Sequence, residues 1–171
     1  MRKYTPKDNV QNKPYFSDRF FVTPSVPRYE IFSDTIFAKD YQAIAKEVGI
    51  NKVYIEHTHL VLHISKNDIV KAIKFLKDEL SYDMLIELSA IDYIASKNGY
   101  EVFYEMLSFT KHKRLRVKCF VPKNESIESV TSIFKSANWS EREMYDMFGI
   151  KIINHPNLKR LIMPDDWYDH P

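Results

Sequence analysis

The eight prolines of this 171-residue chain lie almost entirely at its two ends. Four fall within residues 1–37 and three within residues 154–171, so that only Pro122 interrupts the middle of the chain. Proline lacks a backbone N–H and fixes φ, which excludes long helices and central strands where it recurs. The sequence therefore predicts an extended N-terminal arm over 1–37, a regular core over 38–153 and an extended C-terminal strap over 154–171.

The N-terminal arm is rich in aromatic residues, whereas solvated disordered segments are usually poor in them. Eight aromatic side chains lie there: Tyr4, Tyr15, Phe16, Phe20, Phe21, Tyr29, Phe32 and Phe37. Two interpretations remain open for these rings. They fold back onto the core of their own chain, or they anchor a partner, because aromatic residues are enriched at the centres of interfaces.

The first half of the core alternates between helical and strand-like periodicity. Apolar residues at helical spacing predict a short helix over 39–48, with Gly49 as a left-handed cap. Two β-rich runs at 52–57 and 60–65 predict a hairpin. Cap residues at 65–68 then precede a second amphipathic helix that contains Ile69, Ile73, Leu76 and Leu80.

The second half of the core reads as an antiparallel meander. Its strand-like runs are 84–95, 100–109 and 114–121, the first two joined across Asn98-Gly99, a dipeptide suited to positive φ. Helical spacing near 127–135 and again after Trp139 predicts two further helices. The order favours an α+β fold, a two-layer domain in which helices pack on one face of a mostly antiparallel sheet, with extended arms at both ends.

Composition excludes several classes of function. Lysine and arginine number 25 against 23 aspartate and glutamate residues, and this small excess argues against a dedicated nucleic-acid binder. Cys119 is the single cysteine, so the chain by itself cannot form a disulfide, a four-cysteine zinc site or an iron–sulfur cluster. The three glycines, all at predicted boundaries, leave no phosphate-binding loop. With no apolar run long enough to span a bilayer and no secretory signal, a cytoplasmic location is expected.

The segment after Trp139 carries the most information. Ser140 and Glu143 match a capping box, which predicts a helix of about two turns beginning at Ser140 and ending at Gly149. Its apolar side would consist of Met144, Met147 and Phe148. Arg142 and Asp146 stand four residues apart and are expected to pair within the helix.

The strap that follows changes charge along its length, from Lys151, Lys159 and Arg160 to Asp165, Asp166 and Asp169. Apolar residues, Trp167 among them, separate the charges. Arg160 is a candidate partner for Asp165 or Asp166, but alternating anchors and charges suit a groove on another protein. We expect the charges of the strap to act mainly between chains.

Several residues together resemble a known signature. Glu141-Arg-Glu-Met-Tyr-Asp-Met-Phe148 is followed after six residues by His155, and after three more by Lys159-Arg-Leu-Ile162. This pattern resembles that of the thirty-kilodalton, or C, subunit family of respiratory complex I. The continuation to Pro171 and the sequence Leu88-Ser-Ala-Ile-Asp-Tyr93 are also similar to that family.

The resemblance implies a peripheral-arm subunit of a proton-translocating NADH:quinone oxidoreductase, on the cytoplasmic side of a bacterial inner membrane. It implies contact with the larger, hydrogenase-related D subunit. It also implies that this chain carries no catalytic residue, metal or cofactor, and that flavin, iron–sulfur clusters and quinone belong to other subunits. The positions expected to bind partners are Trp139, Glu141, Arg142, Glu143, Asp146, Phe148, Gly149, His155, Pro156, Lys159, Arg160, Met163, Pro164, Asp165, Asp166 and Trp167.

Three rival functions stand beside this one. A membrane-bound nickel–iron hydrogenase or formate hydrogenlyase contains a similar domain and is the first alternative, which rests on the same residues. A stand-alone zinc enzyme would use His57, His59 and His63, although a turn near residue 58 would separate them. The basic run 111–118 could meet RNA or an acidic protein, but it is better explained as a turn and the polar face of a strand.

The remaining reactive side chains favour structural roles. Asp165, Asp166, Asp169 and His170 could hold a hard cation, but a solvated or arginine-paired acidic stretch is the better interpretation. Glu141 and Glu143 face apart on a helix, so they suit its positive end better than an acid–base pair. Cys119 alternates with Val117 and Val121, which predicts a buried, inert thiol.

Overall fold

The computed structural model describes residues 28–29 and 36–171, and the remainder of the N-terminal arm lies outside the described residues. Its main feature is a six-stranded sheet in the order β1-β2-β3-β6-β5-β4. The strands are β1 (Arg28–Tyr29), β2 (Ile50–Glu56), β3 (His59–Ile64), β4 (Met84–Asp92), β5 (Gly99–Ser108) and β6 (Lys113–Pro122). Every pairing is antiparallel except that of β3 with β6.

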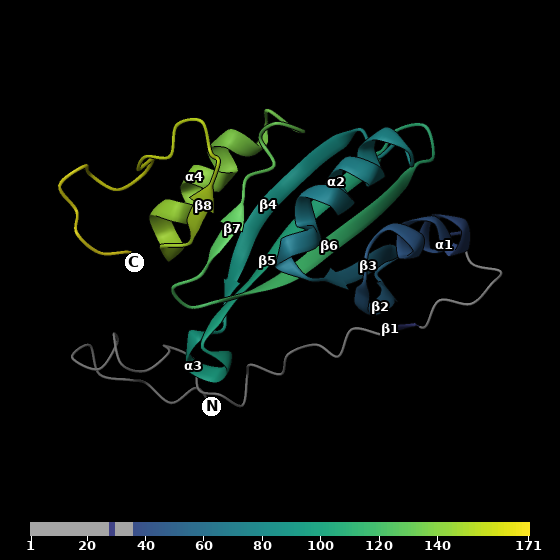
Figure 1. The fold of residues 1–171 in the computed structure, drawn as a ribbon, viewed down its shortest axis with the longest axis horizontal. Helices are drawn as coiled ribbons and strands as arrows, with labels where there is room; N and C mark the ends of the chain where they lie inside the picture. The colour runs from purple at the N-terminus through teal and green to yellow at the C-terminus, as the bar shows by residue number, and fades with distance from the viewer. Residues whose placement is uncertain (1–27, 30–35) are drawn as a thin grey trace, which may run out of the picture.

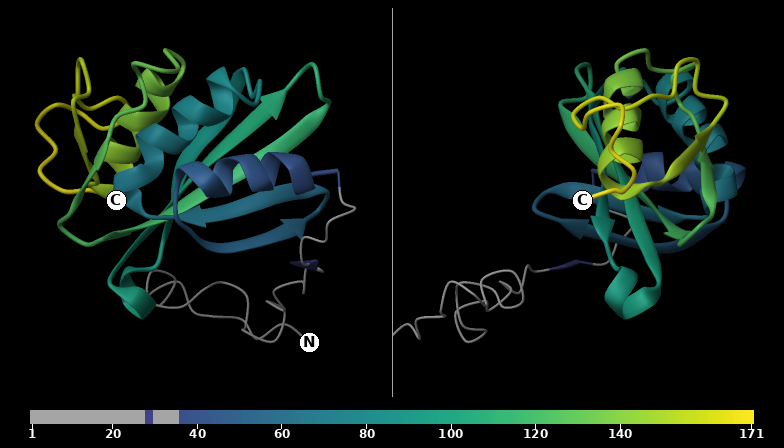
Figure 2. Two further views of the ribbon diagram at one scale, coloured as in Figure 1. Left: turned by 45° about the vertical axis from the view of Figure 1, so that its right-hand side comes forward. Right: turned by 90° about the vertical axis from the view of Figure 1, so that its left-hand side faces the viewer.

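The helices cover one face of this sheet, as the sequence predicts (Figures 1 and 2). They are α1 (Ala38–Glu47), η3 (Lys66–Asp68), α2 (Ile69–Asp78) and α4 (Ala137–Phe148), while α3 (Ile94–Lys97) is a single turn between β4 and β5. Ile44, Ile73 and Met144 bring α1, α2 and α4 into one core with Tyr104 and Val117 of the sheet. A second, parallel sheet joins β7 (Ser126–Glu128) to β8 (Lys151–Ile153).

Local chemistry explains why several predicted elements form. Ser65 accepts a hydrogen bond from the N–H of Asn67 at 3.3 Å and so caps the turn that leads into α2. His57 and Thr58 both have positive φ, which gives the β2–β3 hairpin the two-residue turn that matches strand twist. Asn98 is left-handed, as expected, but it ends α3 rather than joining two strands directly. The hairpin and the helix over 69–78 are confirmed.

Three local predictions are wrong. Gly49 is not left-handed: Val48 ends α1 in an extended conformation. The helix predicted over 127–135 is absent, because Ile127 pairs with Ile152 in the β7–β8 sheet and turns follow. The apolar spacing there reflects burial of Ile127, Val130 and Phe134 from an irregular segment, which periodicity alone cannot distinguish from a helix.

The start of α4 is the third error. The helix begins at Ala137 after Ser136, so Ser140 lies inside it and makes no capping box. Gly149 ends the helix at φ 71°, as predicted. The extra turn matters because it places Glu141 in the second turn, on the buried side of the helix, and no longer at its positive end.

The structure tests the two interpretations of the aromatic residues in the N-terminal arm at one residue. Phe37 precedes α1 and is 1% exposed within the core, so this ring folds back onto its own chain. The prediction for the other seven aromatic residues lies outside the residues whose side chains are described. Among the described residues, no helix is long and apolar enough to cross a membrane.

Candidate docking site

Helix α4 buries three charged side chains on the faces that contact the rest of the chain. Glu141, Arg142 and Asp146 are 2%, 8% and 0% exposed. Burial of a charge is costly unless hydrogen bonds or an opposite charge compensate it, so each of the three must have specific partners. The hydrogen-bond partners of these three side chains all lie outside the helix, and they attach it to two other segments of the chain.

Asp146 binds the C-terminal segment, residues 154–171, at four points. Its Oδ2 accepts hydrogen bonds from three consecutive backbone N–H groups, those of Leu161 (3.0 Å), Ile162 (2.7 Å) and Met163 (2.9 Å). Its Oδ1 accepts one from Nη1 of Arg160 at 2.8 Å. Successive N–H groups that converge in this way form a concave anion site in the backbone. The carboxylate of α4 therefore fills an anion site made by the segment that follows it.

The same contacts determine the direction in which the pKa of Asp146 is shifted. Burial by itself raises the pKa of its carboxyl, but the hydrogen bonds from Met163, Ile162, Leu161 and Arg160 outweigh burial and hold the pKa well below its ordinary value. A carboxyl with a depressed pKa stabilises the folded state above its unfolded pKa, near 3.9. Its contribution is lost progressively as the pH falls below that value.

Acid should therefore release the C-terminal segment. In a Trp139→Phe variant, Trp167 is the only tryptophan and reports on this segment. We expect its fluorescence emission to shift to longer wavelength as the pH is lowered below about 4, because protonation of Asp146 removes the acceptor of three N–H groups. The same titration with Asp146→Asn added should show no transition there. A constant emission between pH 5 and about pH 1 in the first variant would contradict the assignment.

Arg142 reinforces this attachment through backbone carbonyls. Its Nε donates to the carbonyl of Lys159 at 3.1 Å and its Nη2 to that of Arg160 at 2.8 Å. The guanidinium also lies over the ring of Trp139, 5.2 Å from its centroid. The predicted ion pair between Arg142 and Asp146 is wrong, because both side chains turn to the C-terminal segment instead. Arg160 is Asp146's cationic partner, which also corrects the predicted pairing of Arg160 with Asp165 or Asp166.

The far end of the segment returns to the same helix. Nη2 of Arg160 donates to the carbonyl of Asp169 at 3.1 Å, and Nδ1 of His170 donates to the carbonyl of Asp146 at 2.8 Å. The imidazole also packs edge-on against Tyr145, with centroids 5.7 Å apart. A Cβ at Gly149 would come within 2.7 Å of the His170 ring, so glycine serves both the left-handed turn and this close approach.

Glu141 attaches the opposite side of α4 to the segment before it. Its carboxylate accepts hydrogen bonds from Oγ of Ser129 at 2.6 Å and from the N–H of Val130 at 2.7 Å. Burial raises the pKa of Glu141, and these two hydrogen bonds offset part of that rise. The side chain of His155 is fully buried beside it: Nδ1 accepts from the N–H of Asn157, and Nε2 therefore donates to the carbonyl of Asn138.

Between its two attachments the C-terminal segment projects a loop, residues 164–168, which Figure 1 shows in yellow beyond α4. Trp167 is 49% exposed and Tyr168 is 97% exposed. Asp165 and Asp166 are also exposed, and among the described residues neither forms an ion pair or a hydrogen bond. The loop is aromatic and acidic, and both of its ends are fixed while its side chains make few contacts. This composition and these fixed ends suit the binding of another protein.

The structure thus brings together about half of the residues that the sequence predicts to bind partners. Those in the network described above are Trp139, Glu141, Arg142, Asp146, Gly149, His155, Lys159, Arg160 and Met163. Phe148 packs instead against Tyr100, with centroids 5.9 Å apart. Glu143, Pro156, Pro164, Asp165, Asp166 and Trp167 are exposed and make none of these contacts.

Sequence reasoning missed Ser129, Val130, Leu161, Ile162, Asp169 and His170 as parts of this network. Four of these contribute backbone groups, which no side-chain motif reveals. One signal did exist. Ala137, Glu141, Met144 and Phe148 share a stripe at helical spacing, which places the charge of Glu141 among apolar neighbours and predicts a buried partner for it.

The rival sites are explained by other contacts. His57 lies in the β2–β3 turn, apart from His59 and His63, and within 28–29 and 36–171 no group of three or more His, Cys, Asp or Glu could hold a metal ion. Burial raises the pKa of Cys119 to about 12, as expected of an inert thiol.

The basic run 111–118 is largely neutralised within the chain. Lys111 and Lys113 pair with Asp40, Arg116 with Glu105, and Lys118 with Glu101. These contacts match the interpretation of the run as a turn and the polar face of a strand.

The part of the chain that forms this network is also the part that matches known proteins. Residues 62–171 match the family described as the 30 Kd subunit of respiratory-chain NADH dehydrogenase. The C subunit of NADH-quinone oxidoreductase from Citrifermentans bemidjiense is 42% identical over 109 residues, which are 63% of this chain and 68% of that protein. The protein of the same name from Trichlorobacter lovleyi is 37% identical over 127 residues, 73% of this chain and 78% of its own.

A solved structure shares the fold. A chain in the membrane-bound sulfane sulfur reductase, an archaeal respiratory membrane complex, superposes with a TM-score of 0.66 at 16% identity, over 75% of this chain and 76% of that one. The family match includes the whole of α4 and the C-terminal segment that it holds. This chain therefore belongs to the 30 Kd subunit family of respiratory-chain NADH dehydrogenase.

Proposed function

We propose that this chain is a non-catalytic subunit of the peripheral arm of a proton-translocating NADH:quinone oxidoreductase. It lies on the cytoplasmic side of a bacterial inner membrane and holds the larger, hydrogenase-related D subunit of the quinone-reducing module. The support is the family membership together with the relatives, which are named as the C subunit of NADH-quinone oxidoreductase. Flavin, iron–sulfur clusters and quinone then reside on other subunits.

The observation that carries this proposal is the attachment of the C-terminal segment to Asp146. Three backbone N–H groups and Arg160 fix one end of the segment, and His170 fixes the other. In this proposal the chain divides into an arm over 1–37, a core over 38–153 and a docking strap over 154–171. The core acts as a rigid base, so that the strap meets its partner with little loss of conformational entropy.

A second candidate is the equivalent subunit of a membrane-bound nickel–iron hydrogenase or formate hydrogenlyase. The fold also occurs in a respiratory complex with a different name, the sulfane sulfur reductase, so it is compatible with this candidate. The fold does not separate the two candidates. The 42% identity to a quinone oxidoreductase subunit supports the first one.

The neighbouring large subunit decides between them. We expect the affinity-tagged full chain, expressed in its own bacterium, to co-purify from membranes with a large subunit that lacks nickel-binding cysteines. Deleting the chain should abolish NADH-driven quinone reduction in those membranes because the larger subunit is no longer held in place. Recovery of a large subunit with nickel-binding cysteines would favour the second candidate. A tagged chain that stays free of any respiratory complex would contradict both.

A further inference from the structure

A cleft of about 410 Å³ lies at the end of α4, on the side where the C-terminal segment returns. Five separate parts of the chain line it: α3, the start of β5, the turn after β6, the α4–β8 junction and residues 169–170. Tertiary structure alone creates this cleft, because the lining residues are spread from Ile94 to His170. Its volume falls within the range of sites that bind ligands or short peptide segments.

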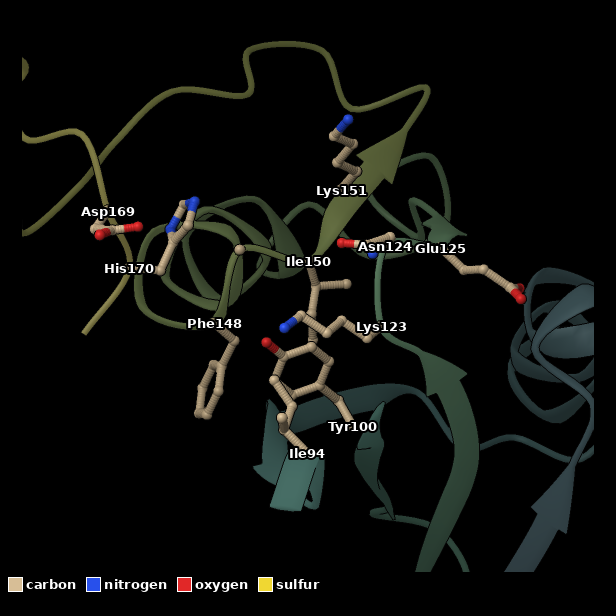
Figure 3. A pocket seen from close by; sticks show the side chains of 11 residues that line it. Ile94, Tyr100, Lys123, Asn124, Glu125, Phe148, Ile150, Lys151, Asp169 and His170 are labelled. Carbon is tan, nitrogen blue, oxygen red and sulfur yellow. The ribbon is translucent and has the colours of Figure 1, made fainter. Parts of the chain in front are cut away.

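The floor of the cleft is apolar. Ile150 is 2% exposed, and the rings of Tyr100 and Phe148 meet edge-on with centroids 5.9 Å apart. Ile94 completes this surface. Figure 3 shows the Tyr100 and Ile94 side chains below Ile150, with Phe148 beside them. Such a floor would take up an aliphatic or aromatic side chain.

The rim carries two hydrogen-bond donors, Lys123 and Tyr100, beside the carboxylates of Glu125 and Asp169. In Figure 3 the ammonium group of Lys123 and the hydroxyl group of Tyr100 point to the same side of the cleft. Burial, with a smaller effect of Asp92, raises the pKa of Tyr100, which keeps the phenol protonated and able to donate at neutral pH. Within the described residues neither group has an acceptor, whereas the nearby Glu125 pairs with Lys66. A cation and a neutral donor over an apolar floor suit a carboxylate that stands next to an apolar side chain.

We propose that this cleft binds an acidic segment of a neighbouring subunit, in which an aspartate or glutamate meets Lys123 and Tyr100 and an adjacent apolar side chain rests on Phe148. The inference rests on the proposed function, since the neighbour is a subunit of the same complex. Continuity supports a protein occupant: Asp169 and His170 of the strap form one wall, so a partner on the strap lies beside the cleft. The site is a second, separate contact, because its donors take no part in holding the strap.

Lysine reactivity tests this directly in the assembled complex. We expect acetylation of Lys123 by an amine-reactive reagent to be at least tenfold slower in the complex than in the free full-length chain. Lys74, an exposed residue of α2 that is remote from the cleft, should label at the same rate in both. A carbodiimide, which joins an amine to a carboxylate with loss of water, should link Lys123 to an aspartate or glutamate of another subunit. Equal labelling of Lys123 in both states would overturn the proposal.

Variants separate this proposal from the proposed function. Lys123→Glu should weaken reassembly of the purified chain with complex lacking it by about tenfold, whereas Lys74→Glu should have no effect. If substitutions in the strap weaken assembly and Lys123→Glu does not, the proposal for the cleft is contradicted while the proposed function stands. If the chain joins no complex, both fail. Protection of Lys123 in the free chain by millimolar acetate or citrate would identify a small carboxylate as the occupant and would also overturn the proposal.

Discussion

Replacing Asp146 with asparagine should detach the C-terminal segment from α4. The amide cannot accept from three N–H groups and neutralise Arg160 at once, and Arg160, with 12% of its side chain exposed, would keep a poorly compensated charge. Removing one partner of a buried pair typically costs about 3–5 kcal/mol. We expect the free energy of local opening, from hydrogen exchange of amides 161–163, to fall by about this amount while the core amides keep their protection.

The matched control is Asp166→Asn, which removes an equal charge from the same segment. Asp166 is exposed, so its replacement should leave the exchange of amides 161–163 unchanged. In the bacterium, Asp146→Asn should sharply reduce the amount of assembled peripheral arm. Native exchange rates at 161–163 in the Asp146→Asn variant would show that the anion site does not hold the segment.

The second large effect is expected from the exposed rings of the loop. Trp167 and Tyr168 lie outside the core, so replacing both with alanine should leave the thermal midpoint of unfolding within about 2 °C of its original value. Tryptophan and tyrosine at the centre of an interface each contribute about 2 kcal/mol or more to binding. The double variant should therefore bind complex lacking this subunit at least about a hundredfold more weakly, measured by titration of the purified chain.

Phe109→Ala provides the comparison for that experiment. Phe109 is 57% exposed and follows β5, at the other end of the sheet from α4 and the strap (Figure 1). This replacement removes a similar exposed aromatic area but leaves the loop unchanged. The Phe109→Ala variant should therefore bind as tightly as the original chain does. Equal affinities for the double variant and the Phe109 variant would mean that the loop is not the docking element.

Taken together, these contacts show how a helix of only 12 residues is kept in place. Helices of this length are marginal in isolation and depend on packing. Here Met144 and Ala137 enter the core, while Glu141 holds the preceding turn and Asp146 the following segment. The charged residues of the signature thus bind backbone groups of the same chain, and the partner would meet the surface that they position.

Some of this could be predicted from residue order because the relevant physics is local. The β2–β3 hairpin follows from alternating apolar residues around a turn, α2 from helical spacing after Ser65, and the end of α4 from Gly149. The α+β class follows from the order of those elements. The helix expected over 127–135 failed because buried irregular chain, such as Val130 and Phe134, shows the same apolar spacing as a helix. The start of α4 is predicted too late because Ser140 and Glu143 match a capping box, whereas the helix begins at Ala137 after Ser136.

Residue order alone establishes where regular structure can form, which residues carry charge at the C-terminus, and which family their pattern resembles. The partners of those charges, in contrast, depend on the folded arrangement of the chain. Asp146 has an arginine four residues away on its own helix, yet it binds Arg160, 14 residues further along, and the N–H groups of the next three residues. The physical reason is that a buried carboxylate is stabilised by convergent backbone donors, and their convergence depends on how the whole chain folds.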